Sequence, residues 1–137
     1  MSNNLHEATT ILAETPMCFI ATVNGTKPQV RAFQYQFEQA GALWFCTAKS
    51  KDVFKQLQAN PAVEICAVTQ NMAWVRIAGT VVFKDEPTVK ERILAEQPLI
   101  KSIYKSASNP DFTTFCLEHG TFTIADFSGT PPRTGSF

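Results

Sequence analysis

The sequence lacks an excess of charge of either sign. Its 137 residues include 12 lysines and arginines, which are balanced by 12 aspartates and glutamates. No long-range positive field is therefore available to attract a nucleic-acid backbone, and any bound anion must be held by a local site. We do not expect a nucleic-acid partner.

Long apolar runs and an export signal are also missing. No apolar run approaches the roughly 18 residues that span a bilayer. The N-terminal stretch MSNNLHEATTILAETP carries acids and polar residues where a secretory signal has a basic region. We therefore expect a cytoplasmic protein with no membrane association. Its 45% hydrophobic and 18% charged residues suit one packed domain over 1–137, with a core at about 16–127 and a tail at 128–137.

Cysteine and histidine are too sparse and too scattered to predict a metal site. The four cysteines form no CxxC pair and have no histidine at ligand spacing: Cys18, Cys46, Cys66 and Cys116. Each lies in an apolar, strand-like run, so buried free thiols are expected. His6 falls in a predicted helix and His119 in a predicted turn, which makes neither a good catalytic candidate.

Nucleotide and hydrolase motifs are absent as well. The sequence contains no GxGxxG, GxxxxGK[ST], GxSxG or HExxH. Its acids are scattered, without a pair suited to matched acid and base roles. If the protein is an enzyme, a cofactor is expected to supply the reactivity, and no catalytic residue is assigned.

What is present is a series of short strands with a few helices. Helices are expected at 3–14, from an N-cap at Ser50 to Asn60-Pro61, and at 85–96, while 97–111 is ambiguous. Strands are expected at 17–23, 28–37, 42–47, 62–68 and 72–83, followed by a hairpin over 112–127 that turns at His119-Gly120. Asn24-Gly25 predicts a first hairpin, Gly79 a bulge or bend, and 128–137 a loop or disordered tail.

This order predicts a mainly β (α+β) fold with six or seven mostly antiparallel strands. A small closed barrel is favoured because closure removes exposed sheet edges. The alternative is a sandwich-like α+β domain.

The strand PQVRAFQYQF places an arginine among aromatic residues. Alternation puts Arg31 on the face that carries Phe33, Tyr35 and Phe37. A buried arginine requires an anionic partner, whereas one at the barrel rim keeps its head in water. Both interpretations of Arg31 stay open from the strand alone.

The stretch FCTAKSKDVFKQL changes from apolar to polar where a strand precedes a helix. Thr47 lies at the strand end, and Ser50 and Lys51 lie at the helix start, where free N–H groups and the helix dipole favour a phosphate. A solvated loop with an ordinary helix cap explains the same residues.

WVRIAG projects a tryptophan and an arginine from one strand face. Trp74 and Arg76 could form a cation–π pair, a dimer contact or one wall of a site for a flat aromatic ligand.

Taken in order, PQVRAF, LWFCTAKSKDVFKQLQANPAVEI and WVRIAGTV resemble the FMN-binding split-barrel family typified by pyridoxamine 5′-phosphate oxidase. The resemblance extends from MCFIATV to TFTIADF and is that of a short single-domain member. It implies a six-stranded antiparallel split β-barrel with a few peripheral helices. It also implies a homodimer with FMN bound in clefts at the dimer interface.

The resemblance also assigns residues to the flavin. Arg31 would contact the phosphate or the ring edge, and the backbone of Ala32 and Phe33 would lie against the isoalloxazine. The phosphate would be held by Thr47, Ser50 and Lys51. Trp74 stands where relatives often carry a glutamine that reaches the flavin, and Arg76 is a candidate for the site or the dimer.

The expected function is that of an FMN-dependent oxidoreductase that passes hydride from a reduced donor to a small acceptor. Vitamin B6 oxidation is not expected, because Arg133 is the single arginine in a short tail. Some relatives bind heme or a deazaflavin, but His6 and His119 do not suggest an axial heme ligand. The alternatives are a non-catalytic flavin-binding or ligand-sensing module and a purely structural dimer.

Overall fold

The computed structural model describes residues 3–137. This part of the chain forms four helices: α1 (Asn3–Glu14), α2 (Asp52–Ala59), α3 (Pro87–Glu96) and α4 (Pro98–Tyr104). It forms ten strands: β1 (Met17–Asn24), β2 (Lys27–Gln34), β3 (Phe37–Gln39), β4 (Ala42–Ala48), β5 (Ala62–Val68), β6 (Trp74–Thr80), β7 (Val82–Phe83), β8 (Phe112–Leu117), β9 (Gly120–Ala125) and β10 (Arg133–Ser136).

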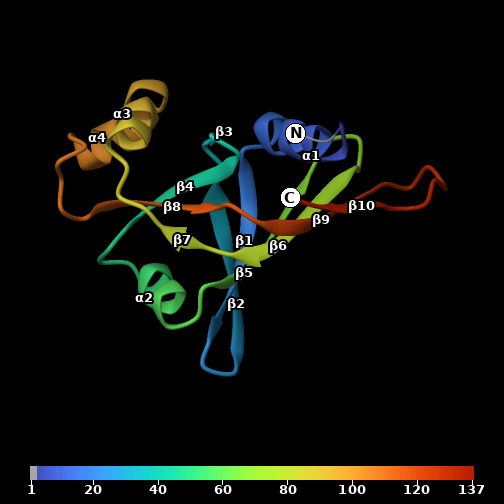
Figure 1. The fold of residues 1–137 in the computed structure, drawn as a ribbon, viewed down its shortest axis with the longest axis horizontal. Helices are drawn as coiled ribbons and strands as arrows, with labels where there is room; N and C mark the ends of the chain where they lie inside the picture. Colours follow the sequence, from blue (N-terminus) through green and yellow to red (C-terminus); the bar gives the residue numbers. More distant parts are fainter. Residues whose placement is uncertain (1–2) are drawn as a thin grey trace.

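The strands are arranged in two antiparallel sheets (Figure 1). The six-stranded sheet has the order β10-β9-β6-β5-β1-β2, and the four-stranded sheet has the order β3-β4-β8-β7. Helices α3 and α4 lie together at one end of the molecule, and the connection between β9 and β10 forms the other end. Helix α1 lies between them, against strands of the six-stranded sheet, and α2 lies beside the protruding β1–β2 hairpin. The mainly β fold is confirmed, with more strands than expected. The expected closed barrel is not found among the described strands, because their pairings leave the two sheets separate.

The first hairpin forms at the predicted site, one residue later than expected. Asn24 pairs with Lys27, so the central turn residues are Gly25 and Thr26. Gly25 has a φ of +63°, a conformation in which a side chain would be strained. The turn therefore depends on Gly25.

The predicted single strand at 72–83 is wrong. The chain leaves the six-stranded sheet after Thr80 and enters the four-stranded sheet at Val82, where Val82 pairs with Cys116. The alternating pattern continues through the bend, so it did not reveal the change of sheet. Gly79 lies within β6, and a Cβ there would meet the His119 carbonyl at 2.8 Å. The glycine permits a close approach of two backbones.

The predicted last hairpin is also wrong, because β8 and β9 do not pair with each other. β8 pairs with β4 and β7, whereas β9 pairs with β6 and β10. The chain crosses between the sheets at Glu118 and His119, beside the first crossing, since Gly79 pairs with Gly120. Two adjacent crossings therefore join the sheets.

The tail was expected to be irregular, but part of it is a strand. β10 pairs with β9, and the backbones of Gly120 and Phe137 exchange two hydrogen bonds. Arg133 forms an ion pair with Glu7 of α1. The C-terminal residues therefore close the edge of the six-stranded sheet.

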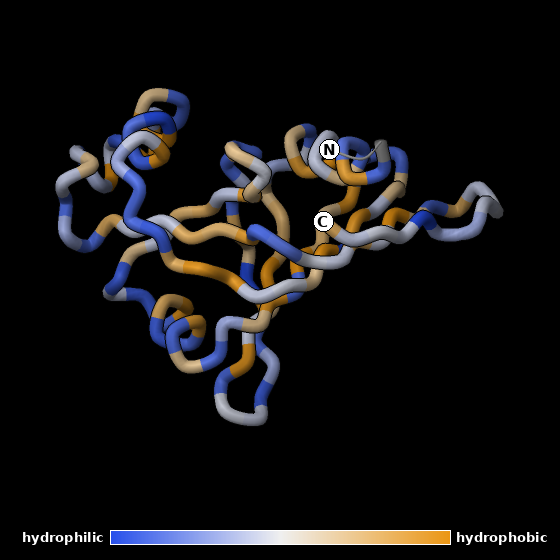
Figure 2. Tube along the Cα trace, in the orientation of Figure 1, coloured by the Kyte–Doolittle hydropathy of each residue, from blue (hydrophilic) through white to orange (hydrophobic). Residues whose placement is uncertain are grey.

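Apolar side chains form two clusters on opposite faces of the four-stranded sheet. The larger lies between the sheets and includes Leu12, Ile20, Phe45, Ile77 and Phe115. The smaller lies under α3 and α4 and includes Trp44, Ile93 and Phe112. The hydropathy colouring places much of the apolar sequence in the central strands (Figure 2). Both faces of β4 and β8 are therefore covered.

The six-stranded sheet has a second side, which we call the outer face. It carries exposed Met17, Phe19, Val30 and Val68, together with exposed Arg76. Phe19 pairs with Ala32 on one side and with Cys66 on the other, which makes the apolar surface continuous across three strands. None of the helices formed by residues 3–137 has the length and apolar composition to cross a membrane.

Candidate functional site

A small pocket lies beside the ends of β2 and β4 and is walled by helix α4. Its volume is about 180 Å³. The strands contribute Met17, Ala32, Phe33, Gln34 and Cys46, and the link between β2 and β3 contributes Gln36. The start of α2 contributes Lys51, and α4 contributes Ile100, Ile103 and Tyr104. The pocket is thus mostly apolar, with one cation at its margin.

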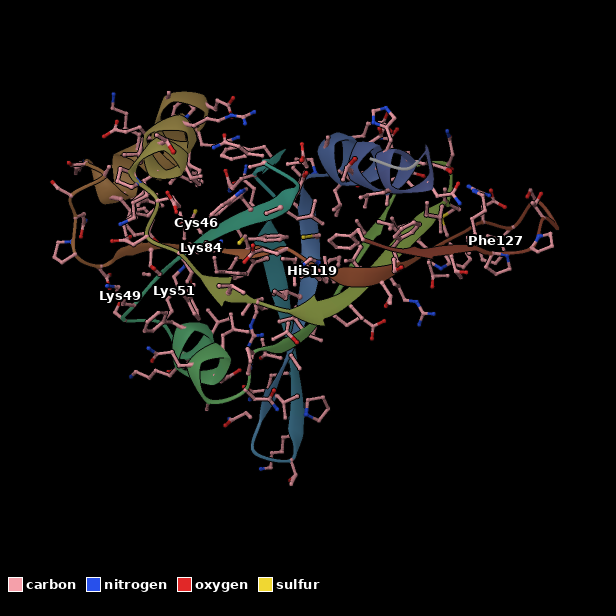
Figure 3. The ribbon with its side chains drawn as sticks, in the orientation of Figure 1. Cys46, Lys49, Lys51, Lys84, His119 and Phe127 are labelled. Atoms are coloured by element: carbon pink, nitrogen blue, oxygen red, sulfur yellow. The ribbon has the colours of Figure 1, made fainter. Side chains whose placement is uncertain are left out.

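Lys51 is placed at the pocket by the turn between β4 and α2 (Figure 3). It occupies the N-cap position, and no side chain caps the helix there. The first-turn N–H groups of α2 therefore have no side-chain acceptor, which leaves the positive end of the helix available to an anion. Lys49 lies on the same turn but does not line the pocket.

Ser50 is not the helix N-cap, so this prediction is wrong. Its hydroxyl donates to Asp111 Oδ2 at 2.9 Å, and its backbone N–H donates to Asp111 Oδ1 at 2.8 Å. The partner lies 61 residues away in sequence, which is why local capping rules pointed elsewhere. Ser50 holds the turn to the start of β8, and a phosphate would have to displace Asp111 to reach it.

Thr47 is 2% exposed and does not line the pocket, and its hydroxyl has no hydrogen-bond partner among the described residues. It shares the inward face of β4 with Leu43 and Phe45, as the alternation predicted. An unsatisfied buried hydroxyl costs roughly 1–3 kcal/mol. A ligand oxygen or bound water would remove this cost.

Arg31 lies on the inward face of β2 and contacts neutral groups. Its Nη1 donates to the Thr22 hydroxyl at 2.7 Å, and its Nη2 donates to Gln56 Oε1 at 2.9 Å. No acid forms an ion pair with Arg31 within residues 3–137. Burial lowers the pKa of its guanidinium from the ordinary value. Arg31 is therefore a desolvated cation without a counter-ion.

Ala32 and Phe33 lie side by side in β2 and both line the pocket. Phe33 packs edge-on against Phe45 and Phe115, with ring centroids 6.2 and 5.7 Å apart. Ala32 points the other way and is exposed. This pair therefore connects the pocket with the outer face.

Trp74 and Arg76 are not brought to the pocket. Both lie on the outer face of β6, where Trp74 packs against Phe127 with ring centroids 5.2 Å apart. Arg76 is exposed and pairs in register with Cys66. Within one chain, these two residues belong to a different surface from Lys51 and Phe33.

Two features of the pocket were not predicted from the sequence: the wall formed by α4, and the glutamines Gln34 and Gln36. Gln34 donates to Gln97 at 3.1 Å, which ties β2 to the junction of α3 and α4. Gln36 Oε1 is buried without a partner. Residues 97–111 looked ambiguous because Pro98 and several serines interrupt the pattern, although Ile100, Ile103 and Tyr104 have helical spacing.

Two titratable groups at the pocket stay neutral near pH 7. Burial raises the pKa of the Cys46 thiol to about 12, and the nearby Lys51 charge partly opposes this rise. Burial also raises the pKa of the Tyr104 hydroxyl to about 12. Neither group is suited to give or take a proton at neutral pH.

Comparison with known proteins places this geometry in a family. Residues 5–123 match the sequence profile of pyridoxamine 5′-phosphate oxidase. A nimC/nimA family protein from Clostridium acetobutylicum is 30% identical, with 100% of both chains covered and a TM-score of 0.86. A comparison with curated proteins found no match.

Two further solved structures share the fold at lower identity. One is a pyridoxamine 5′-phosphate oxidase-related, FMN-binding protein from Nostoc punctiforme, at 13% identity, with 100% and 97% of the two chains covered and a TM-score of 0.70. The other is a heme-binding protein from Mycobacterium smegmatis, at 20% identity and a TM-score of 0.77. The alignment covers 100% of this chain and 58% of that one. On the match over residues 5–123, the chain belongs to the pyridoxamine 5′-phosphate oxidase family.

Proposed function

We propose that the protein binds FMN at the pocket between β2, β4 and α4 and uses it as an oxidoreductase. The observation that carries this proposal is a set of unmatched groups on β2, β4 and the start of α2, of which Lys51 lines the pocket. Within residues 3–137, Arg31 has no acidic partner, Lys51 lies at a helix N-terminus that no side chain caps, and the buried Thr47 hydroxyl has no acceptor or donor. Two cations, free N–H groups and a hydroxyl are the chemistry that holds a phosphate.

The lining of the pocket also suits a flavin better than heme. Ala32 has a small side chain and Phe33 an apolar one, so backbone and ring surfaces can pack against a flat heterocycle. No histidine lines the pocket, and the described histidines lie in α1 and at the sheet crossing. The FMN-binding relative is therefore the better guide to the cofactor than the heme-binding relative.

The pocket of one chain is too small for the whole cofactor. Ligand sites usually enclose about 300–1,000 Å³, compared with about 180 Å³ here. Met17 and Ala32 belong both to the pocket and to the exposed surface of the six-stranded sheet. We infer that a second copy of the chain completes the pocket.

The outer face is the surface proposed for that homodimer. Its exposed Met17, Phe19, Val30 and Val68 form an apolar area that single soluble chains rarely leave open. Trp74 and Arg76 lie on the same face, so dimerisation would bring them towards the interface. The two sheets of each chain would then correspond to the split barrel of the family.

When bound, FMN supplies hydride and electron transfer between a reduced donor and a small acceptor. The protein positions the cofactor: Arg31, Thr47 and Lys51 hold the phosphate, while Ala32 and Phe33 support the ring. Ser50 joins them only if its bonds to Asp111 open. The four free cysteines fit a reducing compartment, which supports a cytoplasmic location.

The cofactor proposal is tested by adding FMN to the purified protein, dialysing it and recording the visible spectrum. A retained flavin spectrum supports the proposal, and a colourless protein contradicts it. Oxidation of NADH or NADPH with quinone, nitro-aromatic or oxygen acceptors then tests catalysis. Retained flavin without turnover would favour the non-catalytic flavin-binding or ligand-sensing module.

A further inference from the structure

A closed network of neutral side chains holds the Arg31 guanidinium. Arg31 donates to both Thr22 and Gln56, and the Thr22 hydroxyl donates to the same Gln56 oxygen at 2.6 Å. Gln56 Nε2 then donates to Gln29 Oε1 at 2.5 Å. The network joins the β1–β2 hairpin to α2, with Gln56 lying 25 residues from Arg31 in sequence, and fixes the position of one charged group.

The side chains that hold Arg31 are uncharged, and this affects what Arg31 can bind. A glutamate at position 56 would give Arg31 a charge-assisted partner, the stronger way to hold an arginine to a helix. Thr22 is 1% exposed, and Gln56 and Arg31 are half-buried, so water compensates the Arg31 charge only in part. Because Thr22 and Gln56 carry no charge, the full positive charge of Arg31 remains available to a ligand.

The geometry also leaves donors free. A guanidinium has five N–H donors, and the network of Thr22 and Gln56 occupies one on each terminal nitrogen at short distance. The contacts of Nη1 with the Ile20 and Gln29 carbonyls are longer, at 3.4 Å. The Nε–H and the second Nη2–H have no recorded acceptor within residues 3–137. Arg31 can therefore donate to an anion without leaving Thr22 or Gln56.

Helix α2 links this network to the other cation. Lys51 precedes the first residue of α2 and Gln56 lies five residues later, about 7.5 Å along the axis at 1.5 Å per residue. Gln56 fixes the helix to Arg31, and the same rigid helix carries Lys51 at its start. The positions of the two cations are therefore coupled through α2.

We propose that Gln56 and Thr22 are positioning residues that hold Arg31 and the start of α2 as a preformed site for the phosphate of the cofactor. This inference rests on the proposed function. It predicts that the network affects binding of the phosphate and has little effect on binding of the flavin ring. FMN and riboflavin, which lacks the phosphate, separate these two contributions.

The experiment measures the dissociation constants of FMN and riboflavin for the full-length protein by quenching of flavin fluorescence. Gln56→Leu and Thr22→Val each remove part of the network, and Gln58→Leu makes the same change at an exposed position of α2. We expect Gln56→Leu to weaken FMN binding about tenfold, the loss of one hydrogen bond to a charged group. Riboflavin binding should change less than about twofold, and Gln58→Leu should resemble the wild type.

Gln56→Glu separates positioning from a purely structural role. The carboxylate keeps an acceptor for Arg31 and Thr22, so folding is retained and thermal stability should not fall. It also neutralises Arg31 and adds a negative charge beside the phosphate. We expect it to weaken FMN binding at least as strongly as Gln56→Leu, with riboflavin unaffected.

Each outcome decides the inference. If the variants change FMN and riboflavin binding equally, or if Gln56→Leu tightens FMN binding, the network does not position Arg31 for the phosphate. If wild-type protein binds FMN and Gln56→Glu leaves this unchanged, the inference fails while the proposed function stands. If wild-type protein binds neither flavin, the proposed function fails and this inference with it.

Discussion

The two faces of the six-stranded sheet are built for different tasks. On the inner face, Ile20, Ile65 and Ile77 are fully buried, and the charged Arg31 is held by neutral hydrogen-bond partners. On the outer face, Phe19 is 53% exposed, and Arg76 lies in solvent without an ion pair among the described residues. The inner face stabilises the single chain, whereas the apolar area of the outer face is available for association.

The difference shows why the pocket is incomplete in one chain. Phe33 belongs to the inner face and Ala32 to the outer face, and both line the same pocket at the sheet edge. One wall is therefore fixed by folding. On the proposed function, the missing wall comes from the second copy of the chain that covers the outer face.

The largest effect should come from truncating an inner aromatic residue. Phe115 lies on β8 of the four-stranded sheet and is fully buried in the cluster that covers the inner face of the six-stranded sheet. Its ring contacts those of Phe33, Phe45 and Phe83. Phe115→Ala should lower the free energy of unfolding by about 3–5 kcal/mol, through lost burial and the cavity left behind. Urea unfolding at low protein concentration measures the change.

The matched variant on the outer face is Phe19→Ala. Because Phe19 is 53% exposed, it should lower the same free energy by less than about 1 kcal/mol. If Phe115→Ala and Phe19→Ala lower the free energy of unfolding equally, the two faces do not differ in their contribution to the stability of the single chain.

Association should depend on the outer face. Phe19→Lys puts a charge into the proposed interface and should weaken dimerisation by about 2 kcal/mol or more, roughly 30-fold in the dissociation constant. Sedimentation equilibrium measures this change. Leu99→Lys alters an exposed apolar residue of α4 and serves as the control. A monomeric wild type, or a Phe19→Lys dimer as stable as the wild type, would contradict the assignment.

Alkaline pH should destabilise the folded protein, because two cysteine thiols are buried in its two apolar clusters. Burial raises the pKa of Cys18 and of Cys116 from 9.0 to about 11. Between these values the unfolded chain loses thiol protons that the folded chain keeps, so stability falls as pH rises. Each thiol should account for about 1–2 kcal/mol over this range. Urea unfolding of the wild type and of Cys18→Ala checks this, because the variant should show a shallower slope.

The last prediction separates two neighbouring lysines. Lys51→Ala removes the cation at the pocket and should weaken FMN binding by about 1–3 kcal/mol. Lys49→Ala should leave it nearly unchanged, since Lys49 does not line the pocket. Fluorescence titration with FMN compares them, and a larger loss for Lys49→Ala would place the phosphate elsewhere.

The sequence predicted individual helices and strands better than the pairing of the strands into sheets. The strand at 62–68 and the helix at 3–14 have the predicted bounds, because alternation and helical spacing are properties of neighbouring residues. The same alternation runs through Val81, so it could not show that the chain changes sheet there. The turn signal at His119-Gly120 likewise did not show that β8 and β9 lie in different sheets. Register between distant strands decides that choice.

For the candidate site, too, the sequence predicted individual residues but not the contacts between distant ones. Family order and spacing singled out Arg31, Thr47 and Lys51, and the structure leaves each of them without an acidic partner. Asp111 as the partner of Ser50 and Gln56 as the partner of Arg31 had no sequence signal, since they lie 61 and 25 residues away. Such contacts exist only after folding brings the elements together.

The central claim is that a pocket completed by the outer face of a second copy holds FMN. Sedimentation velocity of the FMN-loaded protein, followed at a visible flavin band, tests this claim directly. The account predicts that flavin absorbance sediments with a dimer and is lost from the Phe19→Lys monomer. Flavin that sediments with the monomer, or that stays behind while a wild-type dimer sediments, would contradict it.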